Sequence, residues 1–214
     1  MPLPSVNPDF LLKFLVDLLN TPSPTGLAQP AVELTAQALA AFPGLQQAAT
    51  RKGALLAAWP GRSAERSRAL TAHLDTLGAM VKEIKPSGRL KLSKIGGYAF
   101  NTVEGEGCTI FTQSGQQRGS LLIRKASAHV HSSEVGELKR DEENMEVRLD
   151  ARTANPEETR ALGIEVGDFV AFDPRVEVVN GFVRSRHLDD KACAACLVAA
   201  VEAISRAGLQ PCQT

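Results

Sequence analysis

Apolar residues recur at helical spacing near the start of the chain and predict two helices. In residues 7–20, Asn7 is a candidate cap and Pro8 suits the first helical position. The apolar positions that follow are Phe10, Leu11, Phe14, Leu15, Leu18 and Leu19. The segment "TPSPTG" at 21–26 ends this helix, and the alanine-rich residues 30–42 predict a second one.

Two short apolar runs come next, "GALLAAWPG" at 53–61 and "SRALTAHLDT" at 67–76. Turn residues bound both runs, and such runs are typical of strands that are buried on both faces of a sheet. The opening quarter of the chain therefore predicts an α/β arrangement.

After Gly78 the pattern changes to short alternating strands. Two hairpins are predicted, one around residues 86–88 and one around Ser114 and Gly115. Further strands are expected in "NMEVRLDAR", "GDFVAFD" and "VEVVNGFVR", the last with an Asn180-Gly181 turn. A single short helix, "NPEETRALG", begins at Asn155 with Glu158 three residues later, as in a capping box.

The pattern returns to a helix at Asp189, in "DDKACAACLVAAVEAISRAG". The chain thus predicts an α/β domain that is interrupted by a β-rich insertion. We expect residues 1–76 and 181–214 to form the two parts of the α/β domain and residues 77–180 to form the insertion.

Composition excludes some classes of partner. The 24 basic and 24 acidic residues balance, so the net charge gives no reason to expect nucleic acid or an anionic membrane. No apolar run reaches the roughly 20 residues that span a bilayer, and the first ten residues lack the order of a secretory signal. We expect a cytoplasmic protein whose four cysteines are reduced.

His73 and Asp75 lie two positions apart where a predicted strand ends. Side chains at that spacing point to the same face of a strand, so both can address one site. A neutral imidazole is a good zinc ligand, and a nearby carboxylate can fix its tautomer. The alternative is a core histidine that is hydrogen-bonded to Asp75.

Asp189 and Asp190 stand at the predicted start of the last helix. Carboxylates at a helix N-terminus are favoured by the helix dipole, so ordinary capping is one interpretation. The functional interpretation is that Asp189 bridges two metal ions, which in such sites lie roughly 3.5–4 Å apart.

The remaining histidines and the cysteines are weaker candidates. His129 and His131 share one face of a possible strand end but have no acidic or thiol partner nearby, and His187 could support the acidic pair. Cys193 and Cys196 form a Cys-x-x-Cys inside an alanine-rich helix without a second pair for zinc. We expect them to be small packing residues rather than a redox or zinc site.

Together these motifs resemble the tetrahedral aminopeptidases, a family of co-catalytic metallopeptidases that includes proteins described as glutamyl aminopeptidases and endoglucanases. The resemblance runs along nearly the whole chain through "LLNTPSPTG", "HLDTLGAMVKEI" with "GRLKLSKIGG", "LDARTANPEETRALGIEVGDFVAF" and "NGFVRSRHLDDKACA". The separation of 116 positions from His73 to Asp189 suits a β-rich insertion between two parts of one metal site.

The resemblance implies a role for three residues. His73 would be a ligand of one metal, Asp75 would orient it, and Asp189 would bridge two divalent ions, usually zinc or cobalt. The implied fold is a zinc-peptidase α/β sandwich with a PDZ-like β domain, which assembles dimers into a hollow dodecamer. The implied reaction is removal of N-terminal residues from peptides by a metal-activated water.

The chain departs from the family in two ways. Lys191 stands where the family usually has arginine, and no counterpart is present for the family's glutamate pair, later aspartate and final histidine. Glu202 is the only glutamate after Asp190, and we expect it to be solvated. We therefore expect the 214 residues alone to be inactive. The alternatives are a non-catalytic chain that acts through oligomerisation and, less favoured, a thiol-redox protein.

Overall fold

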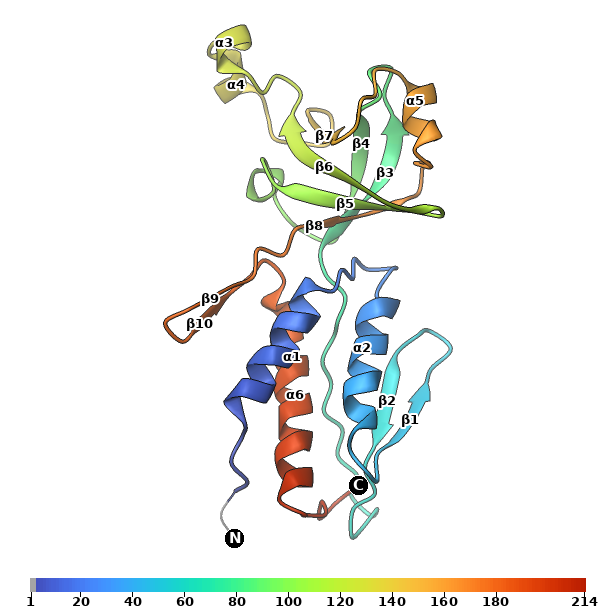
Figure 1. Ribbon diagram of the computed structural model, residues 1–214, viewed down its shortest axis with the longest axis vertical. Coiled ribbons are helices and arrows are strands. Elements are labelled where there is room, and N and C mark those ends of the chain that lie inside the picture. The colour runs from blue at the N-terminus through green and yellow to red at the C-terminus, as the bar shows by residue number, and fades with distance from the viewer. Residues whose placement is uncertain (1–2) are drawn as a thin grey trace. The chain divides into compact units, whose positions relative to one another are not determined.

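The computed structural model describes residues 3–214, so the first two residues of the segment tested for a secretory signal lie outside it. The described chain divides into two compact units (Figure 1). One unit comprises the residues up to Thr76 together with Pro174–Thr214, and the other is Leu77–Asp173. Within residues 3–214, no helix combines the length and apolar character that crossing a membrane requires.

Three helices form the centre of the first unit: α1 (Pro8–Asn20), α2 (Gln29–Ala40) and α6 (Leu188–Arg206). The first helix confirms the predicted cap, because the Asn7 side chain accepts hydrogen bonds from the backbone N–H groups of Asp9 and Phe10. The three helices share one apolar core, made of Phe14, Leu15, Leu18, Leu19, Ala31, Leu39, Ala194, Ala195 and Val198. This packing brings the last predicted helix against the first (Figure 1).

Of the two strands predicted in this unit, the one within residues 53–61 forms but is not buried, and the one within residues 67–76 does not form. Strands β1 (Gln46–Ala49) and β2 (Leu55–Ala58) form a two-stranded antiparallel sheet in which Leu56 is 59% exposed. Residues 67–75 form no strand, and Leu70 is 78% exposed. The apolar composition of residues 67–75 suits a sheet. Within residues 3–214, however, no strand pairs with this segment, so its backbone forms no ladder of interstrand hydrogen bonds.

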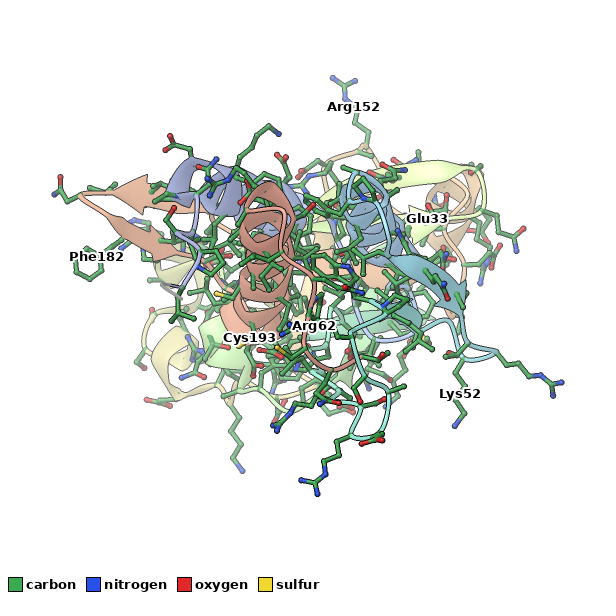
Figure 2. All side chains as sticks on the ribbon, turned by 90° about the horizontal axis from the view of Figure 1, so that it is seen from below. Glu33, Lys52, Arg62, Arg152, Phe182 and Cys193 are labelled. Carbon is green, nitrogen blue, oxygen red and sulfur yellow. The ribbon has the colours of Figure 1, made fainter. Side chains whose placement is uncertain are left out.

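A second hairpin in this unit confirms the predicted Asn180-Gly181 turn. Strands β9 (Glu177–Val179) and β10 (Phe182–Arg184) pair antiparallel, and Asn180 and Gly181 both have positive φ angles. Two such residues are what a two-residue hairpin turn of the type I′ kind requires. The Phe182 side chain is 79% exposed and extends away from the hairpin (Figure 2).

The second unit is a closed barrel of six antiparallel strands. They are β3 (Gly78–Ile84), β4 (Leu90–Ile95), β5 (Gly107–Thr112), β6 (Gly115–Ile123), β7 (Met145–Leu149) and β8 (Phe169–Phe172), in the order β3-β4-β7-β6-β5-β8. The β3–β4 and β5–β6 pairs confirm the two predicted hairpins. Inward-facing residues such as Leu90, Ile110, Leu121 and Val147 are fully buried and fill the barrel.

Short helices connect strands of the barrel unit: η1 (Phe100–Thr102), α3 (Ala128–His131), α4 (Glu134–Glu137) and α5 (Pro156–Ala161). In α5 the Asn155 side chain accepts a hydrogen bond from the Glu158 N–H at 2.9 Å, as predicted. The Glu158 carboxylate accepts from the N–H of Ala154 rather than of Asn155, so the capping box is displaced by one residue. His129 and His131 lie on α3, which corrects their placement at a strand end.

A buried carboxylate on the barrel is held by two cations. Glu146, on β7, accepts from Lys85 Nζ at 2.6 Å and from a guanidinium nitrogen of Arg89, and its side chain is 4% exposed. Burial alone would raise the pKa of Glu146, but the two hydrogen-bonded cations outweigh it and lower the pKa below its usual value. Glu146 is therefore ionised in the fold at neutral pH.

Candidate active site

His73 and Asp75 belong to a segment that has no strand partner but is held by the loop after α1. The backbone at Pro24 bridges in parallel to Thr76, and the Thr76 N–H donates to Ser23 O at 2.8 Å. The fully buried Ser23 hydroxyl donates to Leu74 O at 2.7 Å. The "TPSPTG" segment, which we predicted only as the end of a helix, therefore fixes the backbone around both candidate residues.

The structure brings His73 and Asp189 together across 116 residues of sequence. His73 Nε2 lies 3.2 Å from Asp189 Oδ1, and the His73 N–H donates to Asp190 Oδ2 at 3.4 Å. On the other side of the ring, Nδ1 lies 3.1 Å from the backbone oxygen of Asp75 and 3.4 Å from its Oδ1. The imidazole of His73 thus contacts both other predicted site residues, Asp75 and Asp189, and the backbone of His73 contacts Asp190.

The contacts of the His73 ring determine where its protons lie. A carbonyl oxygen only accepts hydrogen bonds, so Nδ1 carries hydrogen toward Asp75. In the neutral ring Nε2 then presents a lone pair to Asp189 Oδ1, and two acceptors 3.2 Å apart need a cation between them. Partial burial lowers the pKa of His73, but the Asp75 carbonyl and the three carboxylates together raise it, so a proton is favoured at this place.

A divalent metal fits the same place. Two ligands each about 2.1 Å from a tetrahedral zinc stand about 3.4 Å apart, close to the spacing of His73 Nε2 and Asp189 Oδ1. The Nδ1–H contact with Asp75 is the type of contact that orients a metal-binding histidine. Among residues 3–214, however, no group of three or more His, Cys, Asp or Glu side chains is placed to hold a metal, so this pair lacks a third ligand.

The acidic pair does not cap α6 in the ordinary way. No side chain makes a capping hydrogen bond at the start of this helix, and Asp189 and Asp190 have non-helical backbone angles within its first residues. The peptide bond between them is cis. The Asp189 side chain is 94% exposed and is directed to His73 rather than to the backbone N–H groups of α6.

Lys191, directly after the acidic pair, is fully buried. Its Nζ donates to Leu18 O at 2.9 Å and to Thr21 O at 2.6 Å, both at the C-terminal end of α1. Burial lowers the pKa of Lys191 to about 8. This residue was noted in the sequence only as a departure from arginine; the sequence signal for its burial was a lone charge followed by small apolar residues.

Other sequence candidates lie differently from expectation. Cys193 and Cys196 are exposed rather than packed, and Cys193 is visible on α6 in Figure 2. A hydrogen bond to Asp190 raises the pKa of Cys193, which is the opposite of an activated redox thiol. Glu202 is buried rather than solvated; its Oε1 accepts from Arg206 Nε at 2.8 Å on the same helix, and its buried Oε2 has no hydrogen-bond partner among the described residues.

His187 is 6% exposed and precedes α6, and its N–H donates to the Ser185 hydroxyl at 3.3 Å. It is therefore a buried residue close in sequence to the acidic pair. His129 and His131 belong to the barrel unit.

Comparison with known proteins identifies the family of the chain. A family model described as M42 glutamyl aminopeptidase matches residues 53–214. The chain belongs to the peptidase M42 family. The matched range contains His73, Asp75 and Asp189 as well as the whole barrel.

Relatives and solved structures support the membership. YhfE of Bacillus subtilis (strain 168), which its name describes as an aminopeptidase, is 46% identical over 195 residues, or 90% of this chain and 56% of YhfE. Lysyl aminopeptidase of Pyrococcus furiosus is 26% identical over 140 residues, or 65% of this chain and 39% of the relative.

The fold is that of solved M42-like structures. A TET aminopeptidase from Thaumarchaeota archaeon SCGC AB-539-E09 matches with a TM-score of 0.82 at 18% identity, covering 94% of this chain and 56% of that protein. The TET1 peptidase of Pyrococcus horikoshii matches with a TM-score of 0.78 at 21% identity, covering 94% and 58%. The chain therefore spans little more than half the length of the relatives it matches.

Proposed function

We propose that this chain serves a metal-dependent aminopeptidase that removes N-terminal residues from peptides. Family membership supports a peptidase over the alternative of a non-catalytic oligomerisation subunit. The observation that carries the metal part is the 3.2 Å approach of His73 Nε2 to Asp189 Oδ1, since it places two metal-ligand atoms at the separation that a shared ion requires.

Each residue then has a distinct task. His73 would offer Nε2 to one ion. The backbone oxygen of Asp75 accepts from the Nδ1–H of His73 and so holds the ring. Asp189 would offer two carboxylate oxygens, enough to bridge a pair of ions. Imidazole and carboxylate donors suit zinc and cobalt, and such ions polarise a scissile carbonyl and activate water.

We further propose that the 214 residues are not sufficient for turnover. A catalytic zinc usually has three protein ligands, and the attacking water needs a base within hydrogen-bond reach. The described residues supply His73 and Asp189 without a third ligand. The matched relatives are about 1.6 times as long, so residues corresponding to their remaining length would complete the site.

The barrel unit is proposed to act in assembly as a PDZ-like domain. Solved structures with a similar fold include a dodecamer of PhTET1-12s and a Pyrococcus horikoshii peptidase that forms a tetrahedron or an octahedral shell. Sedimentation velocity tests this: we expect dimers or larger species, and a monomer at micromolar concentration would contradict the assignment.

Calorimetric titration with zinc or cobalt, together with an aminoacyl-p-nitroanilide assay, tests the function. We expect weak binding of metal that His73→Ala abolishes, and no turnover by the chain alone. His129→Ala is the matched control, because it removes an exposed histidine of the other unit. Metal binding that survives His73→Ala would refute the ligand assignment, and turnover by the unmodified chain would refute the incompleteness.

A further inference from the structure

The buried ammonium of Lys191 anchors the start of α6 to the end of α1. The last turn of α1 has no basic residue, and its final carbonyls carry the negative end of the helix dipole. Lys191 Nζ donates to two carbonyls there, Leu18 O at 2.9 Å and Thr21 O at 2.6 Å. These contacts hold the chain immediately after Asp189 and Asp190 against the start of the loop at residues 21–25.

The other end of the same loop holds the histidine segment. The Thr25 hydroxyl donates to Asp75 Oδ2 at 2.5 Å, and the Thr25 N–H donates to Thr76 O at 3.2 Å. The free oxygen of the Asp75 carboxylate, Oδ1, faces His73 Nδ1. Thr25 therefore fixes the carboxylate that fixes the imidazole.

We propose that Lys191 and Thr25 are positioning residues that set the spacing between His73 and Asp189 through the loop at 21–25. The proposal rests on the proposed function, in which those two side chains share a metal. The contacts close a ring: the loop binds Lys191 at one end and Asp75 at the other, and His73 contacts Asp75 and Asp189.

Physical reasons favour this over simple packing. The Asp189 side chain is 94% exposed, so little packing surrounds it and its place depends on the backbone and on the contact with His73. The backbone angles at Asp189 and Asp190 are non-helical, so the regular geometry of α6 does not set the direction of the Asp189 side chain. Lys191 lies two residues after Asp189, and its Nζ donates to two carbonyls at the end of α1, so this anchor restrains the backbone close to Asp189.

Four variants separate positioning from stability. Lys191→Met keeps the approximate length of the side chain but removes its charge and its hydrogen-bond donors. Lys191→Arg keeps the charge and the donors. Thr25→Val removes only the hydroxyl donor, at an exposed position. Val198→Ala is the matched control, because Val198 is buried in the same helical core on α6, seven residues after Lys191.

The readout is the imidazole Cε1–H resonance of His73, which can be assigned among the four histidines with His73→Gln. We expect Lys191→Met and Thr25→Val to displace this resonance more than Val198→Ala does, and Lys191→Arg to restore it. Where cobalt binding is measurable, its dissociation constant should rise about tenfold or more in the first two variants, as is usual when a group that orients a ligand is lost.

The outcomes are decisive in either direction. A His73 resonance in Lys191→Met and Thr25→Val that moves no further than in Val198→Ala refutes the proposal. If Lys191→Met does not fold, Thr25→Val decides alone. The spectrum needs neither metal nor turnover, so a chain that binds no zinc or cobalt but shows a displaced resonance would count against the proposed function and still support the positioning roles.

Discussion

Replacing Glu146 by glutamine tests whether the buried carboxylate holds the barrel together. The side chain is 4% exposed and accepts from Lys85 and Arg89, whose own side chains are 25% and 38% exposed. Glutamine has nearly the same shape but no charge, and its single carbonyl oxygen cannot serve both cations as well as a carboxylate does. The variant therefore removes one charge-assisted hydrogen bond and weakens the other without creating a cavity.

The expected loss is about 2 kcal/mol. A hydrogen bond to a charged group contributes about 1.5–3 kcal/mol, and removing one partner of a fully buried ion pair costs about 3–5 kcal/mol. Lys85 and Arg89 are partly exposed and can regain water, which reduces the cost toward the lower figure. In a unit the size of Leu77–Asp173 this corresponds to a fall in Tm of roughly 8–16 °C.

Urea unfolding at several pH values measures the effect. Because the pKa of Glu146 is lower in the fold than the unfolded value of 4.5, its contribution is complete above that value and is lost as pH falls through the folded pKa. The difference between the wild type and Glu146→Gln should therefore disappear in acid. The control is Glu143→Gln, an exposed partner of Lys91 whose loss should matter much less. Equal losses in the two variants, or a difference that persists in acid, would refute the reasoning.

Three further predictions concern the core, a turn and the thiols. Leu121→Ala, at a fully buried barrel position, should lower the unfolding free energy by about 2–5 kcal/mol in urea titration, and a loss under about 1 kcal/mol would contradict the packed barrel. Gly88→Ala should lower the unfolding free energy by about 1 kcal/mol or more in the same assay, because the φ of Gly88 is +77° and the new Cβ would lie 3.0 Å from a threonine hydroxyl. An unchanged urea midpoint would show that the turn relaxes. Cys193 and Cys196 should react with a thiol reagent in the native protein. Cys108 should react only on unfolding, because it is fully buried and burial raises its pKa to about 12. Rapid labelling of Cys108 in the native protein would show that the barrel opens.

Local chemistry made much of the fold predictable. The cap at Asn7, the α5 cap at Asn155 and the Asn180-Gly181 turn each depend on residues within a few positions, and all three form as expected. The alternation in residues 78–123 likewise predicted both hairpins, because the turn sets the strand register. Closure of the barrel depends on pairing between distant strands, which no local pattern specifies.

Two errors share a physical cause. The predicted strand at 67–76 and the predicted packing of Cys193 and Cys196 were inferred from apolar composition alone. Composition indicates that a segment can be buried, but burial also needs a neighbour on the face concerned: Leu70 and the two cysteines are exposed, whereas Ala72 and Leu74 of the same run pack against the helical core. The converse error is Glu202, a charged residue that lies buried on α6 and accepts from Arg206 one helical turn away.

The approach of His73 to Asp189 depends on a part of the chain that seemed unrelated to the site. The family motifs fixed which residues would meet, but the sequence assigned "TPSPTG" only the end of a helix. In the fold its hydroxyls and carbonyls contact Leu74, Asp75 and Lys191. At an exposed site water and salt screen the Coulombic attraction between two side chains, so this attraction fixes their positions poorly. Buried hydrogen bonds nearby have to fix the backbone that carries those side chains. The buried Ser23 and Lys191 meet that requirement, and in our proposal this is how a loop without ligands bears on the proposed metal site.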